Sequence, residues 1–206
     1  MDRLLSGYRR FRAEMWPSER ATYEALAMYG QNPHTLVIAC SDSRVDPQRV
    51  FGAGPGEMFS VRNIAGLVPP YAPDSHHHGT SAAVEYAVRV LKVKRAVVLG
   101  HAQCGGVRAM AEGAPSDAQD FVSRWMEIAA PVLETIPRVG PLHELLPKYE
   151  AAVVRLSLAN LRTFPWVAEA EEAGSLQVEG FQFDIHTGVL SRLAGEDFVA
   201  VDQSSF

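Results

Sequence analysis

The stretch Cys40-Ser41-Asp42-Ser43-Arg44 directly follows an apolar run at residues 35–39 and comes just before Asp46-Pro47. A second stretch, His101-Ala102-Gln103-Cys104-Gly105-Gly106, follows a similar run at residues 95–100. Short, continuous apolar runs are typical of strands that are covered on both faces, as in parallel sheets. Asp followed by Pro is typical of a helix N-cap and the first helical residue. Each stretch is therefore expected to lie at the carboxyl end of a buried strand.

The rest of the chain alternates strand-like and helix-like patterns. We expect a further strand at residues 57–61, a pair of strands at 175–183 and 189–193, and helices at 80–91 and through most of 117–173. Prolines, Pro147 among them, are expected to interrupt the long helical region, and residues 62–66 to form a loop. This order predicts an α/β fold, with a mostly parallel β-sheet flanked by helices and a C-terminal antiparallel strand extension. Ligands of such sheets bind outside the carboxyl ends of the strands, where both signature stretches fall.

A single domain over residues 1–206 accommodates this pattern, because a chain of 206 residues can bury one sizeable core. We divide it into an N-terminal helical arm (1–30), an α/β core that carries both signature stretches (31–115), and a helical segment with the C-terminal strands (116–206). Pro17 is expected to lie near the start of the second of two helices in the arm. Such an arm can pack on its own core or embrace a partner subunit, and the sequence leaves both open.

The composition argues against several classes of function. The net charge is −5, so no global attraction draws the chain to nucleic acid or to an anionic membrane. No run is long and apolar enough to span a bilayer, and the first residues lack the apolar stretch of a signal peptide. A cytoplasmic location is therefore expected. The chain has only two cysteines, which argues against a disulfide framework.

Both cysteines, Cys40 and Cys104, lie in the signature stretches, and His101 stands three residues before Cys104. A random pair of cysteines is more often a pair of buried thiols. Zinc, however, binds thiolates and imidazoles in tetrahedral geometry, and a catalytic site keeps one position open for water or substrate. These residues supply three ligands, whereas a structural site more often has four. The set therefore favours a catalytic metal site over a structural one, while the His-x-x-Cys spacing alone is a weak signal.

Asp42 and Arg44 form a pair that can take part in the chemistry of such a site. A carboxylate two residues beyond a ligand can reach the same ion or accept a hydrogen bond from its water, and an arginine can hold that carboxylate bidentately. An ordinary loop salt bridge is the commoner meaning of an Asp–Arg pair. If a helix begins at Cys104-Gly105-Gly106, its N–H groups stabilise a nearby thiolate, and the glycines let the backbone approach closely.

These residues resemble the β-class carbonic anhydrases. Cys-Ser-Asp-Ser-Arg at 40–44 and Gly-His-Ala-Gln-Cys-Gly-Gly at 100–106 are similar to the zinc signatures of that family. The likeness covers nearly the whole chain and includes Gly7-Tyr8-Arg9-Arg10-Phe11, Arg62-Asn63-Ile64-Ala65, Gly79-Thr80-Ser81-Ala82-Ala83, Asn160-Leu161-Arg162-Thr163 and Phe183-Asp184-Ile185-His186-Thr187-Gly188. The resemblance implies zinc-dependent, reversible hydration of carbon dioxide to bicarbonate and a proton, through a zinc-bound hydroxide.

The resemblance also implies roles for individual residues. It implies that Cys40, His101 and Cys104 hold one zinc ion per subunit, and that Asp42 and Arg44 form the catalytic dyad that orients the hydroxide. The substrate-binding residues expected on this basis are Gln31, Phe59, Ile64, Tyr86 and Gly105. In the family this pocket lies at a dimer interface, so the resemblance implies a homodimer, often paired into a homotetramer.

Val37 differs from the residue that one subtype of this family has at the same position. A subtype that is regulated by non-catalytic bicarbonate has a tryptophan three residues before the first zinc cysteine, so Val37 implies the ungated subtype with an open site near neutral pH. The histidines at 76–78 are candidates for carrying the released proton, because histidine titrates in the useful range, but a solvated loop is their commoner meaning.

Other functions stay open at this point. Carbonyl sulfide and carbon disulfide hydrolases resemble this family and keep its zinc motifs, so those motifs do not separate the substrates. A zinc-binding module without turnover would need neither Asp42 nor Arg44. A cysteine phosphatase that used Cys40 and Arg44 would need a longer phosphate-binding loop than the three residues between them.

Overall fold

The computed structural model of the protein describes residues 2–201. Its centre is a six-stranded sheet with the order β2-β1-β3-β4-β5-β6. The strands are β1 (Thr35–Cys40), β2 (Met58–Asn63), β3 (Arg95–His101), β4 (Gln177–Phe183), β5 (Leu190–Ala194) and β6 (Asp197–Ala200). The first four run parallel, and β5 and β6 are antiparallel additions. The predicted α/β fold, with its mostly parallel sheet and C-terminal antiparallel strands, is confirmed.

Helices cover both faces of this sheet, and two more form the N-terminal arm. The α-helices are α1 (Asp2–Arg10), α2 (Trp16–Tyr29), α3 (Pro47–Phe51), α4 (Gly79–Glu85), α5 (Gly105–Glu112), α6 (Arg124–Met126), α7 (Ala130–Thr135), α8 (Leu142–Leu161) and α9 (Pro165–Glu172). Short π-helical or 3-10 turns extend or connect several of them: Phe11–Met15, Ile64–Gly66, Tyr86–Val90, Gln119–Ser123 and Glu127–Ala129. The expected cap before α3 is present, because the Asp46 side chain accepts a hydrogen bond of 3.0 Å from the Gln48 N–H.

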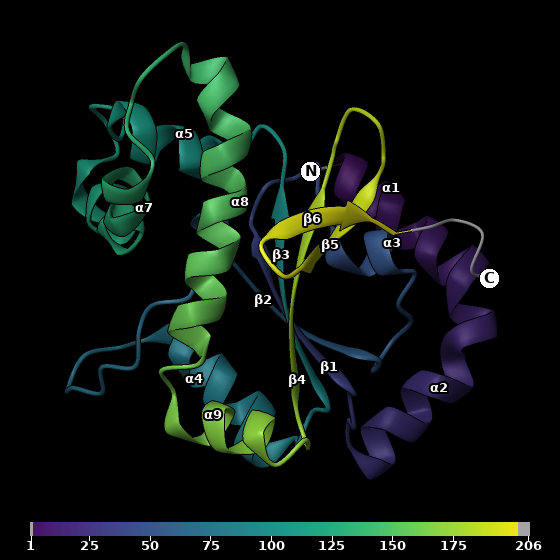
Figure 1. Ribbon diagram of the computed structural model, residues 1–206. Coiled ribbons are helices and arrows are strands. Elements are labelled where there is room, and N and C mark those ends of the chain that lie inside the picture. Colours follow the sequence, from purple (N-terminus) through teal and green to yellow (C-terminus); the bar gives the residue numbers. More distant parts are fainter. Residues whose placement is uncertain (1, 202–206) are drawn as a thin grey trace.

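Apolar side chains cover both faces of the central strands, as their continuous apolar sequences predict. Figure 1 shows the long helix α8 running along one face of the sheet, and there Leu36 and Ile38 of β1 pack with side chains of α4, α8 and α9. On the other face Val37 of β1 and Leu99 of β3 pack with Phe51 of α3. Both strands are therefore rigid supports for whatever follows their carboxyl ends.

Three local predictions differ from the structure. Residues 62–63 belong to β2, which continues to Asn63, and only the 3-10 turn at 64–66 departs from the strand. Pro147 does not end a helix; it lies in the second turn of α8, where the missing N–H removes a single backbone hydrogen bond. The short strand β6 was not predicted at all.

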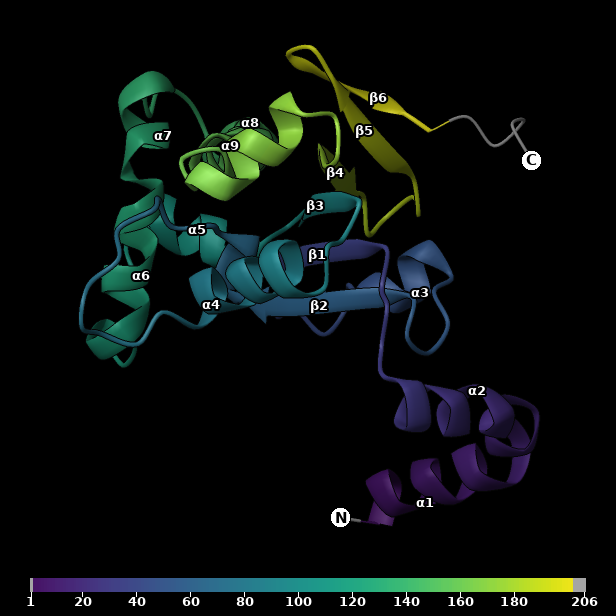
Figure 2. The same cartoon turned by 90° about the horizontal axis from the view of Figure 1, so that it is seen from below.

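The arm at residues 1–30 forms two helices, and Pro17 lies in the first turn of the second, as predicted. None of the described residues in α1, Phe11–Met15 or α2 is buried. Figure 2 shows both helices standing apart from the sheet, on the side away from α8 and α9. The arm does not pack on its own core. Residues 1 and 202–206 of the expected domain lie outside the described part of the chain.

No helix within residues 2–201 combines the length and the hydrophobicity that a bilayer crossing requires.

Candidate metal centre

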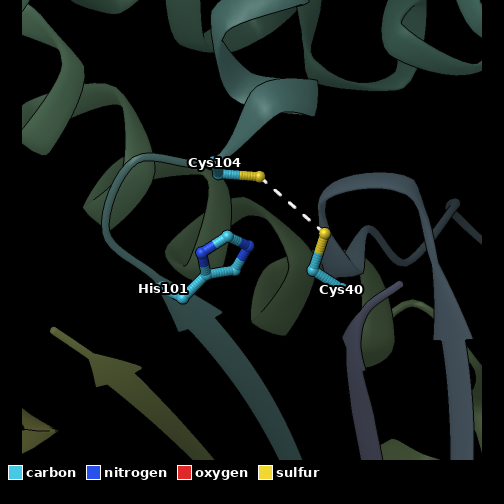
Figure 3. Close-up of side chains that lie close together, drawn as sticks. All are labelled: Cys40, His101 and Cys104. Carbon is cyan, nitrogen blue, oxygen red and sulfur yellow. Dashed lines mark hydrogen bonds between the residues drawn. The ribbon is translucent and has the colours of Figure 1, made fainter. Parts of the chain in front are cut away.

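The sheet itself brings the signature residues together. Cys40 ends β1 and His101 ends β3, and these strands lie side by side in parallel register. Cys104 is the residue directly before α5. Figure 3 shows the three side chains pointing toward one another from the two strand ends and the loop. The Sγ atoms of Cys40 and Cys104 lie 3.9 Å apart, and one ligand atom from each residue lies within 4.8 Å of the others.

His101 provides a test of whether this cluster suits a metal ion. Its Nδ1 lies 2.9 Å from the carbonyl oxygen of Ala102, so Nδ1 carries the proton and Nε2 has a free lone pair. That Nε2 is buried and has no hydrogen-bond partner. Two thiolates on one tetrahedral zinc ion are about 3.8 Å apart, given zinc–sulfur bonds of about 2.3 Å. Both the unpartnered nitrogen and the sulfur–sulfur distance fit a dithiolate–imidazole metal site.

The two buried thiols titrate as a pair. The contact with Cys104 lowers the pKa of Cys40 to about 4, and His101 and the backbone of Asp42 add to this effect against the influence of burial. The same contact and burial raise the pKa of Cys104, against the N–H groups of Val107 and Gly106. The pair therefore readily gives up its first proton and retains its second, and a bound cation displaces that second proton.

Asp42 is held at the edge of this cluster by Arg44. The guanidinium donates from Nε to Oδ1 at 2.9 Å and from Nη2 to Oδ2 at 2.7 Å, and the Arg44 N–H also donates to Oδ1. These contacts hold the pKa of Asp42 well below its usual range, so the carboxylate is ionised. Its Oδ2 lies 3.9 Å from Nε2 of His101. The carboxylate is thus fixed beside the three ligand atoms.

A cavity of about 450 Å³ opens beside the cluster. Its walls include Cys40, Asp42, Ile64, Gly105 and Val122. The surface that they present is mostly apolar, which suits a small apolar molecule next to a reactive polar group.

A family model described as carbonic anhydrase matches residues 35–190. The solved structure of the β-carbonic anhydrase CcaA is similar to this one, with a TM-score of 0.90, 30% sequence identity, and coverage of 98% of this chain and 99% of that chain. The chain belongs to the β-carbonic anhydrase family. It is therefore an enzyme of the lyase class, a carbonic anhydrase, and its reaction is the reversible hydration of carbon dioxide.

Two further proteins that are similar to this carbonic anhydrase support the same family. A carbonic anhydrase of Pseudomonas aeruginosa is 39% identical over 198 residues, which cover 93% of this chain and 87% of the relative. A tetrameric β-carbonic anhydrase of the fungus Sordaria macrospora has a TM-score of 0.81 at 28% identity, with 98% of each chain covered.

The structure places some of the predicted site residues of this carbonic anhydrase together and others apart. The three expected zinc ligands, Asp42 and Arg44 converge, and Ile64 and Gly105 line the cavity. Gln31, Phe59 and Tyr86 are not among the residues that line it. The rings of Phe59 and Tyr86 stack on each other with centroids 5.8 Å apart. His76 and His78 lie on an exposed loop, where both contact Asp74.

Arg62 supports the first signature stretch, and sequence reasoning did not assign it this role. Its Nε donates to the carbonyl oxygen of Cys40 at 2.9 Å, and its Nη2 donates to those of Asp42 and Val45 at 2.7 and 2.8 Å. One planar guanidinium therefore holds three carbonyl groups of the loop. Its place in a stretch shared with the family was the available signal, but nothing in the sequence linked it to that loop.

Glu150 supports the second stretch, and sequence reasoning missed it altogether. It lies on α8, and its side chain is only 3% exposed. Its Oε1 accepts a hydrogen bond of 2.9 Å from the Cys104 N–H. Burial raises the pKa of Glu150 to about 6, and the N–H groups of Cys104 and Gln103 oppose that rise. No spacing rule connects a single glutamate in a helix with a loop 46 residues earlier.

Proposed function

We propose that Cys40, His101 and Cys104 hold one zinc ion per subunit and that Asp42 and Arg44 act as the catalytic pair for carbon dioxide hydration. The observation that carries this proposal is the unpartnered, buried Nε2 of His101, which faces two sulfurs 3.9 Å apart. A buried polar atom without a partner costs free energy, so a ligand role explains its retention. A structural metal site would need neither the carboxylate nor the guanidinium beside it.

The residues around the proposed ligands have separate roles in the reaction. When bound, zinc supplies a water whose pKa is lowered to about 7, and thus a nucleophile at neutral pH. Asp42 accepts a hydrogen bond from that nucleophile and directs it, because Arg44 keeps the carboxylate ionised and fixed. Ile64 contributes apolar wall beside it, where carbon dioxide binds without competition from water. Both carboxylate oxygens of Asp42 are taken by Arg44, which supports the ungated, open site expected from Val37.

We further propose that the complete substrate pocket forms only in a homodimer, which can pair into a tetramer. Gln31, Phe59 and Tyr86 match the substrate pocket of the family, yet they do not line the cavity of their own chain. Tyr86 remains 46% exposed. A second copy can supply these side chains, with Gln31 donating a hydrogen bond to the oxygen on which charge develops.

The test is stopped-flow hydration of carbon dioxide by protein of measured zinc content, from about pH 6.5 to 9. Activity proportional to zinc, rising through one ionisation near neutrality, is expected. Asp42→Asn is expected to keep its zinc while kcat falls by about 100-fold or more. Full activity in that variant would refute the role of Asp42. A wild-type protein with full zinc and no hydration at any pH would direct attention to carbonyl sulfide and carbon disulfide, assayed in parallel.

A further inference from the structure

A single peptide group, the one that joins Gln103 to Cys104, is held from both ends. Its carbonyl oxygen accepts a hydrogen bond of 2.9 Å from Nη2 of Arg44. Its N–H donates to Oε1 of Glu150, also at 2.9 Å. A trans peptide group points its C=O and N–H in opposite directions, so Arg44 and Glu150 lie on opposite sides of it. This peptide group is the link between the catalytic pair and helix α8.

The backbone at this peptide group needs such support. Gln103 has φ of 57°, a left-handed conformation that residues other than glycine rarely adopt. Cys104 has the extended conformation of a helix N-cap, but its side chain caps nothing. Without an acceptor, its buried N–H would remain unsatisfied at the start of α5, at a cost comparable to that of a lost hydrogen bond. Glu150 satisfies it.

The same peptide group can transmit an effect beyond Cys104. Hydrogen bonds in a chain polarise one another, so a carboxylate that accepts from the N–H makes the carbonyl oxygen a stronger acceptor. Here that carbonyl receives the same Nη2 that holds Oδ2 of Asp42. A contact on α8 is thereby joined through one amide to the carboxylate beside the metal ligands.

We propose that Glu150 is a positioning residue of this carbonic anhydrase: through the Gln103–Cys104 peptide group it fixes both the thiolate of Cys104 and the guanidinium of Arg44. The inference rests on the roles proposed above for those two residues. Glu150 itself touches neither substrate nor reacting atoms. It acts by holding the loop in the one conformation that serves both the metal ligand and the catalytic pair.

An apolar filler of the same size is the alternative role for this side chain. A filler has no reason to be a carboxylate, because burial of an ionisable group costs free energy that a methionine would not. Glu150 lies in the apolar neighbourhood of Leu146, Tyr149 and Val153, its neighbours on α8, which are almost fully buried. A filler and a positioning residue respond differently to the removal of the acceptor oxygen alone.

The experiment compares Glu150→Met, which keeps the volume but has no oxygen, with Glu150→Gln, which keeps an acceptor for the Cys104 N–H. We expect Glu150→Met to lose zinc to a chromogenic chelator about 10- to 100-fold faster than wild type, with a similar fall in kcat/KM. In the zinc-free protein, the Cys104 N–H should exchange with solvent faster. Glu150→Gln should restore most of each property. The hydrogen-exchange measurement needs neither zinc nor activity.

Ser157→Ala is the matched control. Ser157 is a fully buried polar residue on the same helix, and its Oγ accepts from a backbone N–H, that of Val68. Its loss should leave zinc release and the exchange of the Cys104 N–H unchanged. Equal behaviour of Glu150→Met and Glu150→Gln, or an effect of Ser157→Ala as large, would overturn the proposal. A wild-type protein that binds no zinc would instead refute the proposed function and leave the exchange result to decide on Glu150.

Discussion

Arg62 shows how much of the site depends on one side chain that touches no ligand atom. It donates to the carbonyl groups of Cys40, Asp42 and Val45, so it holds both a proposed metal ligand and the proposed catalytic residue through their backbone. Arg62→Lys keeps the charge but cannot reach three carbonyl groups with one ammonium. We expect the free energy of unfolding to fall by about 1–3 kcal/mol, measured by chemical denaturation.

Arg20→Lys is the matched control for this prediction. Arg20 pairs with Glu24 on the exposed face of the arm, so its replacement should change the free energy of unfolding by less than about 0.5 kcal/mol. If Arg62→Lys is as harmless as Arg20→Lys, the three hydrogen bonds do not stabilise the loop.

Single residues also mark the limit of prediction from the sequence. Cys40, His101 and Cys104 could be grouped because Cys40 and His101 directly follow strand patterns and Cys104 stands three residues after His101, and strand ends meet at one edge of a parallel sheet. Glu150 could not be grouped with them, since its partner is a backbone N–H, which has no sequence signature. Arg62 lies in a stretch that resembles the family, but its partners are backbone carbonyl groups, which likewise have no sequence signature.

At the scale of elements, the start of α5 approaches the turn at 64–66 so closely that only glycine fits at one of its two first positions. A Cβ on Gly106 would lie 2.8 Å from Cγ2 of Ile64 and 2.9 Å from Cβ of Ala65. A Cβ on Gly105 would meet no atom within 4 Å. We expect Gly106→Ala to reduce the free energy of unfolding by about 1–3 kcal/mol and Gly105→Ala to change it by less than about 1 kcal/mol. Equal effects in denaturation curves would contradict this packing.

The turn between β4 and β5 carries a pH-dependent contribution. The Asp184 carboxylate accepts hydrogen bonds from the N–H groups of His186 and Thr187, and the His186 contact is the larger cause of its lowered pKa. A carboxyl group whose pKa is lower in the folded state stabilises the fold above its unfolded pKa of about 3.9, and this contribution is lost as the pH falls through the folded value. Asp184→Asn should therefore be less stable than wild type at pH 7, by a margin that shrinks below about pH 4. Chemical denaturation of both proteins, stripped of metal with a chelator, measures this difference in the free energy of unfolding at several pH values. A difference that stays constant with pH would refute the stabilising role of the Asp184 carboxylate.

Elements were predictable where a continuous apolar run coincides with burial on both faces. The runs at 35–39 and 95–100 became β1 and β3 because both of their faces are covered. β6 escaped prediction, since Asp197–Ala200 is a short edge strand with mostly exposed side chains. The prediction that Pro147 interrupts the helix was wrong. A proline early in a helix removes only one hydrogen bond, and burial of α8 through Leu146, Tyr149 and Val153 keeps the helix continuous.

At the scale of the whole molecule, the arm at residues 1–30 is the part for which the sequence left two arrangements open. The structure excludes packing on its own core, because none of the described residues of α1 or α2 is buried. Leu4, Met28 and Tyr29 are 79%, 73% and 82% exposed, and such side chains rarely stay in water together. The second copy of the chain proposed above would cover these side chains, and it would also explain why Gln31 and Tyr86 do not line the cavity of their own chain.

This arrangement predicts that assembly and activity fail together. Light scattering of the wild-type protein should give at least twice the chain mass of 22.5 kDa. The full-length triple variant Leu4→Ser, Tyr8→Ser and Met28→Ser should shift toward the single-chain mass. Its kcat/KM should fall and should recover as the protein concentration rises, because association is a mass-action equilibrium. Its zinc content should not change, since all three expected ligands come from one chain.

Val139→Ser is the matched control, at another strongly exposed apolar residue, and it should change neither the mass in solution nor kcat/KM. A fully active single-chain wild type would refute the shared pocket, whereas zinc loss in the triple variant would mean that the arm supports the metal site itself.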